Sequence, residues 1–271
     1  MKQKGPELGR LSSSFFSYVQ LKKKSIVYSG ELTTVLGITP NQEKDLLSRL
    51  SLTGWIVRLK RGVYLVPNRI PAGGQYSPGV AVIVNRLMQE YKAKYQICGP
   101  SAFNYYGFSD QVSNITYVYN DCLSASRKIG GLDFLFIKIE ERRLGGTIAI
   151  KSQEGMKIVY SSKVRTLIDA VYNWKRFNSL PRGYQWTVTE LKKDPGISEE
   201  LVKTAINYSN QSSMKRIGYL LEKLGIPESE LELLLEKIRS PKALIPFLPN
   251  MPRIGKINAR WGVIINGTHV G

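Results

Sequence analysis

Residues 29–65 read SGELTTVLGITPNQEKDLLSRLSLTGWIVRLKRGVYL and decide the fold of the first part of the chain. Their most informative part is residues 39–52, which carry the signals of a helix start. Thr39 can serve as N-cap, Pro40 suits the first helical position, and Gln42 completes a capping box. The stretch therefore predicts a helix that runs from residue 40 to about residue 52.

Upstream of this helix, residues 29–37 predict a shorter helix that stops at Gly37. Two short helices joined by a tight turn have the geometry of a helix-turn-helix. A further helix is expected to start near Leu11, where apolar residues recur at helical spacing. Its buried stripe is predicted to consist of Phe15, Phe16, Val19 and Ile26.

A basic β-hairpin is predicted directly downstream of the third helix. Residues 55–60 and 63–66 alternate like two strands, and Gly62 between them tolerates a positive φ angle. The turn would carry Lys60 and Arg61. This arrangement predicts a winged helix-turn-helix, in which the hairpin is the wing. The alternative is a generic hairpin on a small α+β domain, with a basic tip that only adds solubility.

The third helix is expected to present a polar face to DNA, because its leucines at 46, 47 and 50 lie together on the opposite face. Asp45 has two interpretations: it accepts from a cytosine amino group, or it orients Arg49 four residues on. For each residue taken singly, a solvated helix face is the alternative. The predicted DNA-binding residues are Asn41, Gln42, Lys44, Asp45, Ser48 and Arg49 on the helix, and Arg58, Lys60 and Arg61 on the hairpin.

The charge balance favours a nucleic-acid partner. The 271 residues include 39 Lys or Arg and 21 Asp or Glu, which gives a formal net charge of +18. Residues 1–70 alone hold twelve basic and four acidic residues. Such an excess attracts polyanions without specifying a fold. Together with the predicted helix-turn-helix, it indicates double-stranded DNA as the partner.

Composition also bounds the compartment. No apolar run is long enough to span a membrane, and the N-terminus lacks the pattern of a secretory signal. Cys98 and Cys122 show no paired motif, so a reducing, cytoplasmic location is expected. The single histidine, His269, is expected in a loose terminus. The sequence therefore predicts no metal site, no cofactor and no membrane partner.

The whole chain is predicted to be an α+β protein with two domains. The Pro- and Gly-rich residues 68–74 predict a linker between a DNA-binding domain at 1–70 and a C-terminal domain at 75–271. The latter is expected to be α+β over about 75–180 and helical over about 181–271. Glycine pairs at 130–131 and 145–146 predict hairpin turns. Strands are expected at 115–119, 132–139, 147–150 and 157–160, and helices at 80–91, 161–171, 199–208, 214–224 and 228–238.

A succession of motifs resembles the AbiEi-type antitoxins, which are also described as transcriptional regulators of viral defence systems. Each motif is weak alone, but their order and spacing span nearly the whole chain. The motifs are RLKRGVYL at 58–65, CGPSAFNYYGFS at 98–109, VRTLIDA at 164–170, RIGYLLE at 216–222 and NARWGV at 258–263.

The resemblance implies a winged helix that binds the promoter of its own operon, with inverted repeats as the expected operator. It also implies a C-terminal domain that relieves the toxicity of a co-encoded nucleotidyltransferase-like toxin. In this type IV toxin–antitoxin arrangement of abortive phage infection, a stable complex with the toxin is not expected. The family supplies no catalytic residues to carry over.

Four charged residues of the C-terminal domain are weak candidates for an antitoxin surface. Arg165 and Asp169 stand four apart on a predicted helix, so an ion pair that staples the helix is the favoured interpretation. Arg216 and Arg260 are candidates too. Each has an aromatic residue nearby in the sequence, and the alternative for both is cation–π packing within the domain.

The competing hypothesis is a nucleic-acid-processing enzyme that the winged helix targets to DNA. A nuclease site needs clustered carboxylates that hold Mg²⁺, often with a lysine nearby. Asp133, Lys138 and Glu140 lie along one predicted strand, but Asp133 faces one side and the other two face the opposite side. A regulator that acts by binding is therefore preferred to an enzyme.

Overall fold

The computed structural model describes residues 9–71, 73–111, 113–239 and 243–267, and His269 lies outside them. The architecture is mixed α+β, as the sequence predicts. The chain divides into two compact units, each built from segments distant in sequence. Unit 1 comprises the described residues up to Ala93 together with Ala125–Leu135 and Lys151–Lys157, and unit 2 comprises the rest. The predicted domain boundary after residue 70 stays a prediction.

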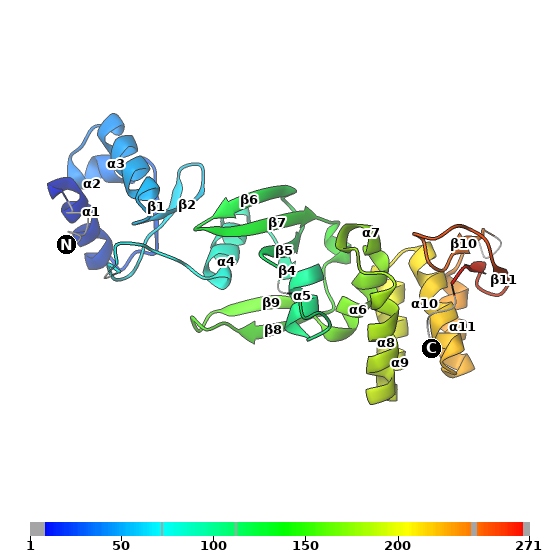
Figure 1. The fold of residues 1–271 in the computed structure, drawn as a ribbon. Helices are drawn as coiled ribbons and strands as arrows, with labels where there is room; N and C mark the ends of the chain where they lie inside the picture. Colours follow the sequence, from blue (N-terminus) through cyan, green and yellow to red (C-terminus); the bar gives the residue numbers. More distant parts are fainter. Residues whose placement is uncertain (1–8, 72, 112, 240–242, 268–271) are drawn as a thin grey trace, which may run out of the picture. The chain divides into compact units, whose positions relative to one another are not determined.

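Three helices open unit 1, namely α1 (Arg10–Leu21), α2 (Glu31–Leu36) and α3 (Pro40–Leu52) (Figure 1). The capping box predicted for α3 is confirmed: the Gln42 N–H donates to Thr39 Oγ1, and the Thr39 N–H donates to Gln42 Oε1 at 2.9 Å. Gly37 adopts the left-handed conformation that ends α2. The boundaries of α3 therefore follow from local sequence alone.

A three-stranded sheet completes this part of unit 1, in the order β1 (Ile26–Tyr28), β3 (Val63–Leu65), β2 (Val57–Lys60). Ile26 was predicted to continue the stripe of the first helix, and this was wrong. The helix ends at Leu21, and Ile26 instead pairs with Leu65 of β3. The core between helices and sheet is apolar, with Phe15, Phe16, Val19, Val27, Leu32, Leu46, Leu47, Leu50, Trp55, Ile56 and Val66 all buried.

The hairpin of β2 and β3 contains a bulge. Pairing shifts between Arg58, which lies opposite Tyr64, and Lys60, which lies opposite Val63. A bulge re-aims the side chains that follow it. The next helix, α4 (Val80–Tyr91), buries one apolar face and contacts β2. Gly74, at the end of the segment predicted as a linker, lies against the Trp55 ring, and two residues later the Tyr76 N–H donates to the Gly54 carbonyl at 2.8 Å.

A six-stranded sheet has the order β6 (Ala125–Ile129), β7 (Leu132–Lys138), β5 (Ile115–Asn120), β4 (Tyr95–Ile97), β9 (Lys157–Ser161), β8 (Thr147–Lys151). Gly130 and Gly131 form the predicted two-residue turn between β6 and β7, both at positive φ. The second glycine pair, at 145–146, is not a hairpin turn. The strands before and after it, β7 and β8, are not neighbours, because β5, β4 and β9 lie between them.

The helices of unit 2 enclose a second apolar core (Figure 1). They are α5 (Gly99–Tyr105), α6 (Lys163–Tyr172), α7 (Trp174–Phe177), α8 (Arg182–Lys193), α9 (Ser198–Tyr208), α10 (Gln211–Lys223) and α11 (Glu228–Lys237). The chain then adds a small sheet in the order β10 (Ile245–Pro246), β12 (Val263–Ile265), β11 (Lys256–Asn258). This sheet was not predicted, since its strands have at most three residues.

Candidate nucleic-acid interface

A groove runs between α3 and the β2–β3 hairpin within unit 1. Its helix side is lined by polar residues of α3, and its other side by the hairpin. The lining residues are Ser29, Gly30, Thr33, Pro40, Glu43, Lys44, Ser48, Ser51, Leu52, Arg58, Arg61, Gly62 and Tyr64. Four predicted DNA-binding residues, Lys44, Ser48, Arg58 and Arg61, thus share one hollow although they lie on different elements.

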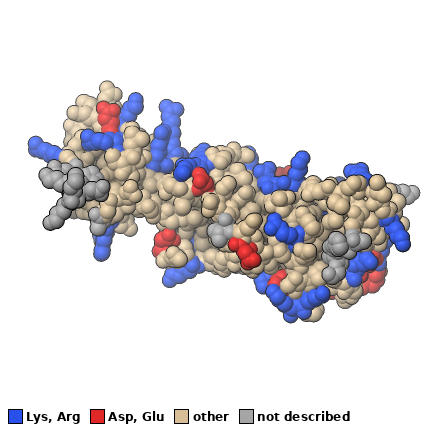
Figure 2. All heavy atoms as spheres, in the orientation of Figure 1, with Lys and Arg blue, Asp and Glu red and all other residues tan. Residues whose placement is uncertain are grey.

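The groove carries a net positive charge. Lys and Arg predominate over Asp and Glu on the face of unit 1 that Figure 2 shows. Among the described residues that line the groove, the cations are Lys44, Arg58 and Arg61, all exposed, and the carboxylate is Glu43. Glu43 is only 4% exposed and is satisfied internally. Its two oxygens accept from the N–H groups of Gly30 at 2.7 Å and Leu32 at 2.8 Å. The groove therefore offers three cations to a ligand, while its carboxylate already has partners.

Glu43 also has a structural role that the sequence did not reveal. A helix start leaves several backbone N–H groups without partners, and the N-cap residue of α2 is Gly30, which has no side chain to cap them. The Glu43 carboxylate, which belongs to α3, supplies this cap from another helix. This contact holds α2 and α3 in a defined relative orientation.

The other predicted residues of α3 are exposed but lie outside the groove. Asn41 and Asp45 belong to this group. The side-chain oxygen of Gln42 accepts the Thr39 N–H in the capping box. Arg49 donates to the Ser12 hydroxyl of α1 at 3.4 Å, so its recorded partner is not Asp45, the partner considered from the sequence.

Lys60 lies at the end of β2, next to the hairpin turn, but does not line the groove. Its Nζ donates to the Glu90 carbonyl at 3.1 Å, lies 3.3 Å from the Glu90 carboxylate and sits 4.8 Å from the centre of the Tyr91 ring. Glu90 also accepts from the Tyr28 hydroxyl at 2.7 Å. Lys60 therefore ties the hairpin to the end of α4, whereas Arg61 stays exposed in the groove. The register shift between Arg58 and Lys60 re-aims the strand, so these two cations, although two residues apart, do not share the groove.

Sequence reasoning did not select the other residues of the groove, of which Glu43 is described above. Ser29 and Thr33 come from the region of α2, Ser51 and Leu52 from the end of α3, and Tyr64 from β3. Leu52 is 85% exposed, which is unusual for a leucine in a structured helix. The available signal was helical spacing, because Ser48, Ser51 and Leu52 lie three and four residues apart on one face.

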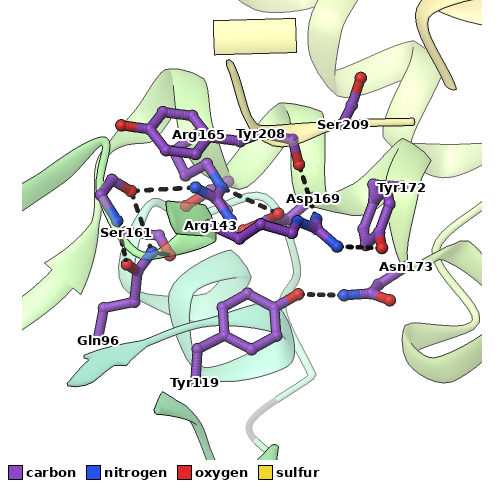
Figure 3. Close-up of polar contacts among 12 residues, drawn as sticks. Gln96, Tyr119, Arg143, Ser161, Arg165, Asp169, Tyr172, Asn173, Tyr208 and Ser209 are labelled. Atoms are coloured by element: carbon purple, nitrogen blue, oxygen red, sulfur yellow. Dashed lines mark hydrogen bonds and ion pairs between the residues drawn. The ribbon is translucent and has the colours of Figure 1, made fainter. Parts of the chain in front are cut away.

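Unit 2 contains a buried polar cluster centred on α6 (Figure 3). Arg165 Nε lies 3.0 Å from Asp169 Oδ1, and both side chains are fully buried. Arg165 also donates to the Gly145 carbonyl at 3.1 Å and lies over the Tyr208 ring. Burial raises the pKa of Asp169, while the Arg165 guanidinium opposes the rise.

This geometry decides between the two interpretations of Arg165 and Asp169. The pair is an internal ion pair, as favoured from the sequence, and neither side chain lies at a surface. A second arginine supports the same region, because Arg143 donates to the Tyr172 hydroxyl and to the Tyr208 carbonyl. The motif at 164–170 is therefore structural in this fold.

The motifs at 216–222 and 258–263 interlock. Gly218 of α10 lies against the fully buried Trp261 ring, where a Cβ would overlap the indole. Glu222 accepts from Asn258 at 3.1 Å and from Arg260 at 2.8 Å. Arg260 stacks on Trp261, as the cation–π alternative predicts, whereas Arg216 is only 6% exposed and donates to the Pro246 carbonyl. The two arginines thus have internal partners.

Of the carboxylates weighed for a nuclease, Glu140 is engaged in an ion pair, and so is its neighbour Glu141. Glu140 pairs with Arg142, and Glu141 pairs with Lys94. Among the residues that the structure describes, no three His, Cys, Asp or Glu side chains gather as a metal ion would need. Within the same described ranges, no helix is both long and apolar enough to cross a membrane.

A family of known proteins matches the N-terminal part of the chain. Residues 13–67 match the family model described as "Transcriptional regulator, AbiEi antitoxin". These residues include α2, α3, the β2–β3 hairpin and the residues that line the groove. The match confirms the resemblance inferred from the sequence and supports the general role of a regulator and antitoxin.

One solved structure extends the comparison to nearly the full length. The crystal structure of the RV2827C protein from Mycobacterium tuberculosis superposes with a TM-score of 0.60 at 16% sequence identity. The match covers 95% of this chain and 92% of that chain, so the two proteins share a fold. No curated protein matches the sequence.

Proposed function

We propose that the α1–β3 part of unit 1 is a winged helix-turn-helix that binds duplex DNA. In this proposal α3 enters the major groove, and Arg58 and Arg61 of the hairpin contact phosphates of a neighbouring backbone or minor groove. The observation that carries the proposal is the groove lined by Lys44, Arg58 and Arg61, whose carboxylate, Glu43, is already satisfied by backbone N–H groups.

The biological role that we propose is a transcriptional autorepressor and antitoxin of a type IV toxin–antitoxin system. Binding to inverted repeats in its own promoter would limit expression of the operon. Unit 2 would counter a co-encoded nucleotidyltransferase-like toxin without a stable complex. The family match over residues 13–67 supports the regulator part, and the motif succession in unit 2 supports the antitoxin part.

A binding assay tests the DNA proposal directly. Fluorescence anisotropy would compare the full chain on the duplex upstream of its own gene with an unrelated duplex, at several salt concentrations. We expect tighter binding to the upstream duplex at every salt concentration, and a logarithmic affinity that falls linearly with the logarithm of salt for both. Equal affinities that depend on salt alone would reduce the groove to a nonspecific charged platform and return the enzyme hypothesis to contention.

A further inference from the structure

The end of the chain displays apolar side chains that the regulator role does not use. Met251 is 50% exposed, Ile254 81% and Ile257 56%. Arg253 and Lys256 lie between them in the sequence and are exposed as well. We call these five residues the C-terminal docking surface. The five residues lie within seven consecutive positions of the chain, and exposed apolar side chains that gather beside charged ones mark interaction sites on soluble proteins.

The loop that carries this surface is held in place by one buried asparagine. Asn266 Oδ1 accepts from the Leu248 N–H, and its amide donates to the carbonyls of Leu248 and Pro252, each at 2.9 Å. Gly255 passes so close to the Ile265 carbonyl that no Cβ would fit there. The exposure of Met251 and Ile254 therefore belongs to an organised loop. Preorganisation of this kind lowers the entropy cost of binding.

The docking surface continues onto a sheet edge. β11 pairs antiparallel with β12, with Ile257 opposite Ile264, and within the described residues β12 is its one strand neighbour. The outer side of β11 thus offers main-chain N–H and C=O groups to another strand. An extended peptide can pair with such an edge strand through main-chain hydrogen bonds, while its alternate side chains contact residues on the two faces of the sheet.

The charge of the C-terminal docking surface indicates which kind of peptide strand would bind beside β11. The sequence has no Asp or Glu after Glu236, so the loop and all three strands of the small sheet lack acidic residues. Arg216 donates to the Pro246 carbonyl, and its pKa is lowered by burial, raised by Tyr184 and lowered further by the positive charge of Arg253. Glu222 of α10 and Glu228 of α11 are already paired with Arg260. The surface is therefore cationic as well as apolar.

We propose that the C-terminal docking surface binds an extended acidic segment of a partner protein, which adds as a strand to β11. Carboxylates of that segment would meet Arg253 and Lys256, and its apolar side chains would cover Ile254 and Ile257. A second copy of this chain fits poorly, because it would bring the same cations to the contact. Nucleic acid would satisfy the cations but would leave the isoleucines exposed.

Selection from a phage-displayed library of random twelve-residue peptides on the immobilised full chain tests the proposal. We expect enriched peptides in which Asp or Glu alternates with Val, Ile or Leu. A synthetic peptide of the enriched sequence should slow hydrogen exchange at the β11 amides. Enrichment of basic or unpatterned peptides, or protection elsewhere in the chain, would overturn the proposal.

Matched variants distinguish binding at this surface from nonspecific peptide binding elsewhere on the protein. Ile254→Asp with Ile257→Asp should weaken peptide binding at least tenfold, and Lys256→Glu should weaken it severalfold. Leu233→Asp is the control, because Leu233 is 42% exposed on α11 and lies outside the surface. Thermal unfolding would check that each variant folds. If Lys256→Glu instead weakened duplex binding and peptide binding did not occur, the surface would be a nucleic-acid contact and the proposal would be wrong.

Discussion

Two neighbouring cations of the hairpin, Lys60 and Arg61, are equivalent in sequence but not in structure. Lys60 is bound by Glu90 and Tyr91, whereas Arg61 lines the groove. We expect Arg61→Ala to weaken binding to all duplexes and to reduce the salt slope by about one, because one phosphate contact is lost. Fluorescence anisotropy over a range of salt concentrations measures both quantities.

Lys60→Ala is the matched control for that experiment. It should leave the salt slope unchanged and lower the free energy of unfolding by at most about 1 kcal/mol, the usual value of a partly exposed ion pair. Urea unfolding measures the stability. An equal change of salt slope in both variants would show that Lys60 leaves Glu90 when DNA binds.

The buried pair Arg165 and Asp169 allows a second prediction at this scale. Asp169→Asn should destabilise the protein by about 3–5 kcal/mol, because it leaves the Arg165 guanidinium without its counter-charge in the core. Replacing both residues, by Met at 165 and Leu at 169, should cost less than the single change. Urea midpoints of the three proteins test this order. A single variant as stable as the wild type would mean that water reaches the guanidinium.

At the scale of elements, contacts between distant segments set the geometry of both units. Glu43 of α3 caps α2. This contact fixes the relative orientation of α2 and α3, the two helices that line one side of the groove. In unit 2, Gly218 of α10 leaves the space that Trp261 fills. Both contacts join residues whose partnership a helix pattern does not reveal.

Gly218→Ala should destabilise the protein although alanine favours helix. The added Cβ would overlap the Trp261 ring, and overpacking of this kind costs about 1–3 kcal/mol. Trp261→Leu in the same chain should recover part of the loss, so the double variant should be more stable than the sum of the single effects predicts. Thermal or urea unfolding of the full cycle measures the coupling. Strict additivity would contradict the proposed contact.

At the scale of the whole molecule, the two proposed activities should be separable without truncation. Deleting residues 1–70 would also remove Tyr28 and Lys60, which hold Glu90 of α4. Arg58→Ala with Arg61→Ala in the full chain avoids this loss. We expect the variant to lose repression of a reporter driven by its own promoter, yet to keep at least part of the growth rescue when the co-encoded toxin is expressed.

Reporter activity and growth are the two readouts of that experiment. Loss of both activities with a normally folded protein would show that DNA binding is needed for neutralisation. Retention of both would show that the hairpin cations do not carry repression, and the groove assignment would then be wrong.

The sequence by itself determined the elements whose signals are local. The start of α3 at Pro40, its capping box and the turn at Gly130 and Gly131 each depend on a few adjacent residues, so each was predictable. The same is true of the mixed α+β composition and of the AbiEi resemblance over residues 13–67. Charge and helical periodicity then selected four of the residues that line the groove.

Only the tertiary structure decided how these elements meet. Lys60 turns away from the groove because Glu90, thirty residues later, lies beside the bulged strand. Arg165 and Asp169 are internal because Gly145 and Tyr208 enclose them, and the order of the six-stranded sheet joins strands that are not consecutive. Caps and turns depend on neighbouring residues, whereas ion-pair partners and strand order depend on contacts that form only when distant segments fold together.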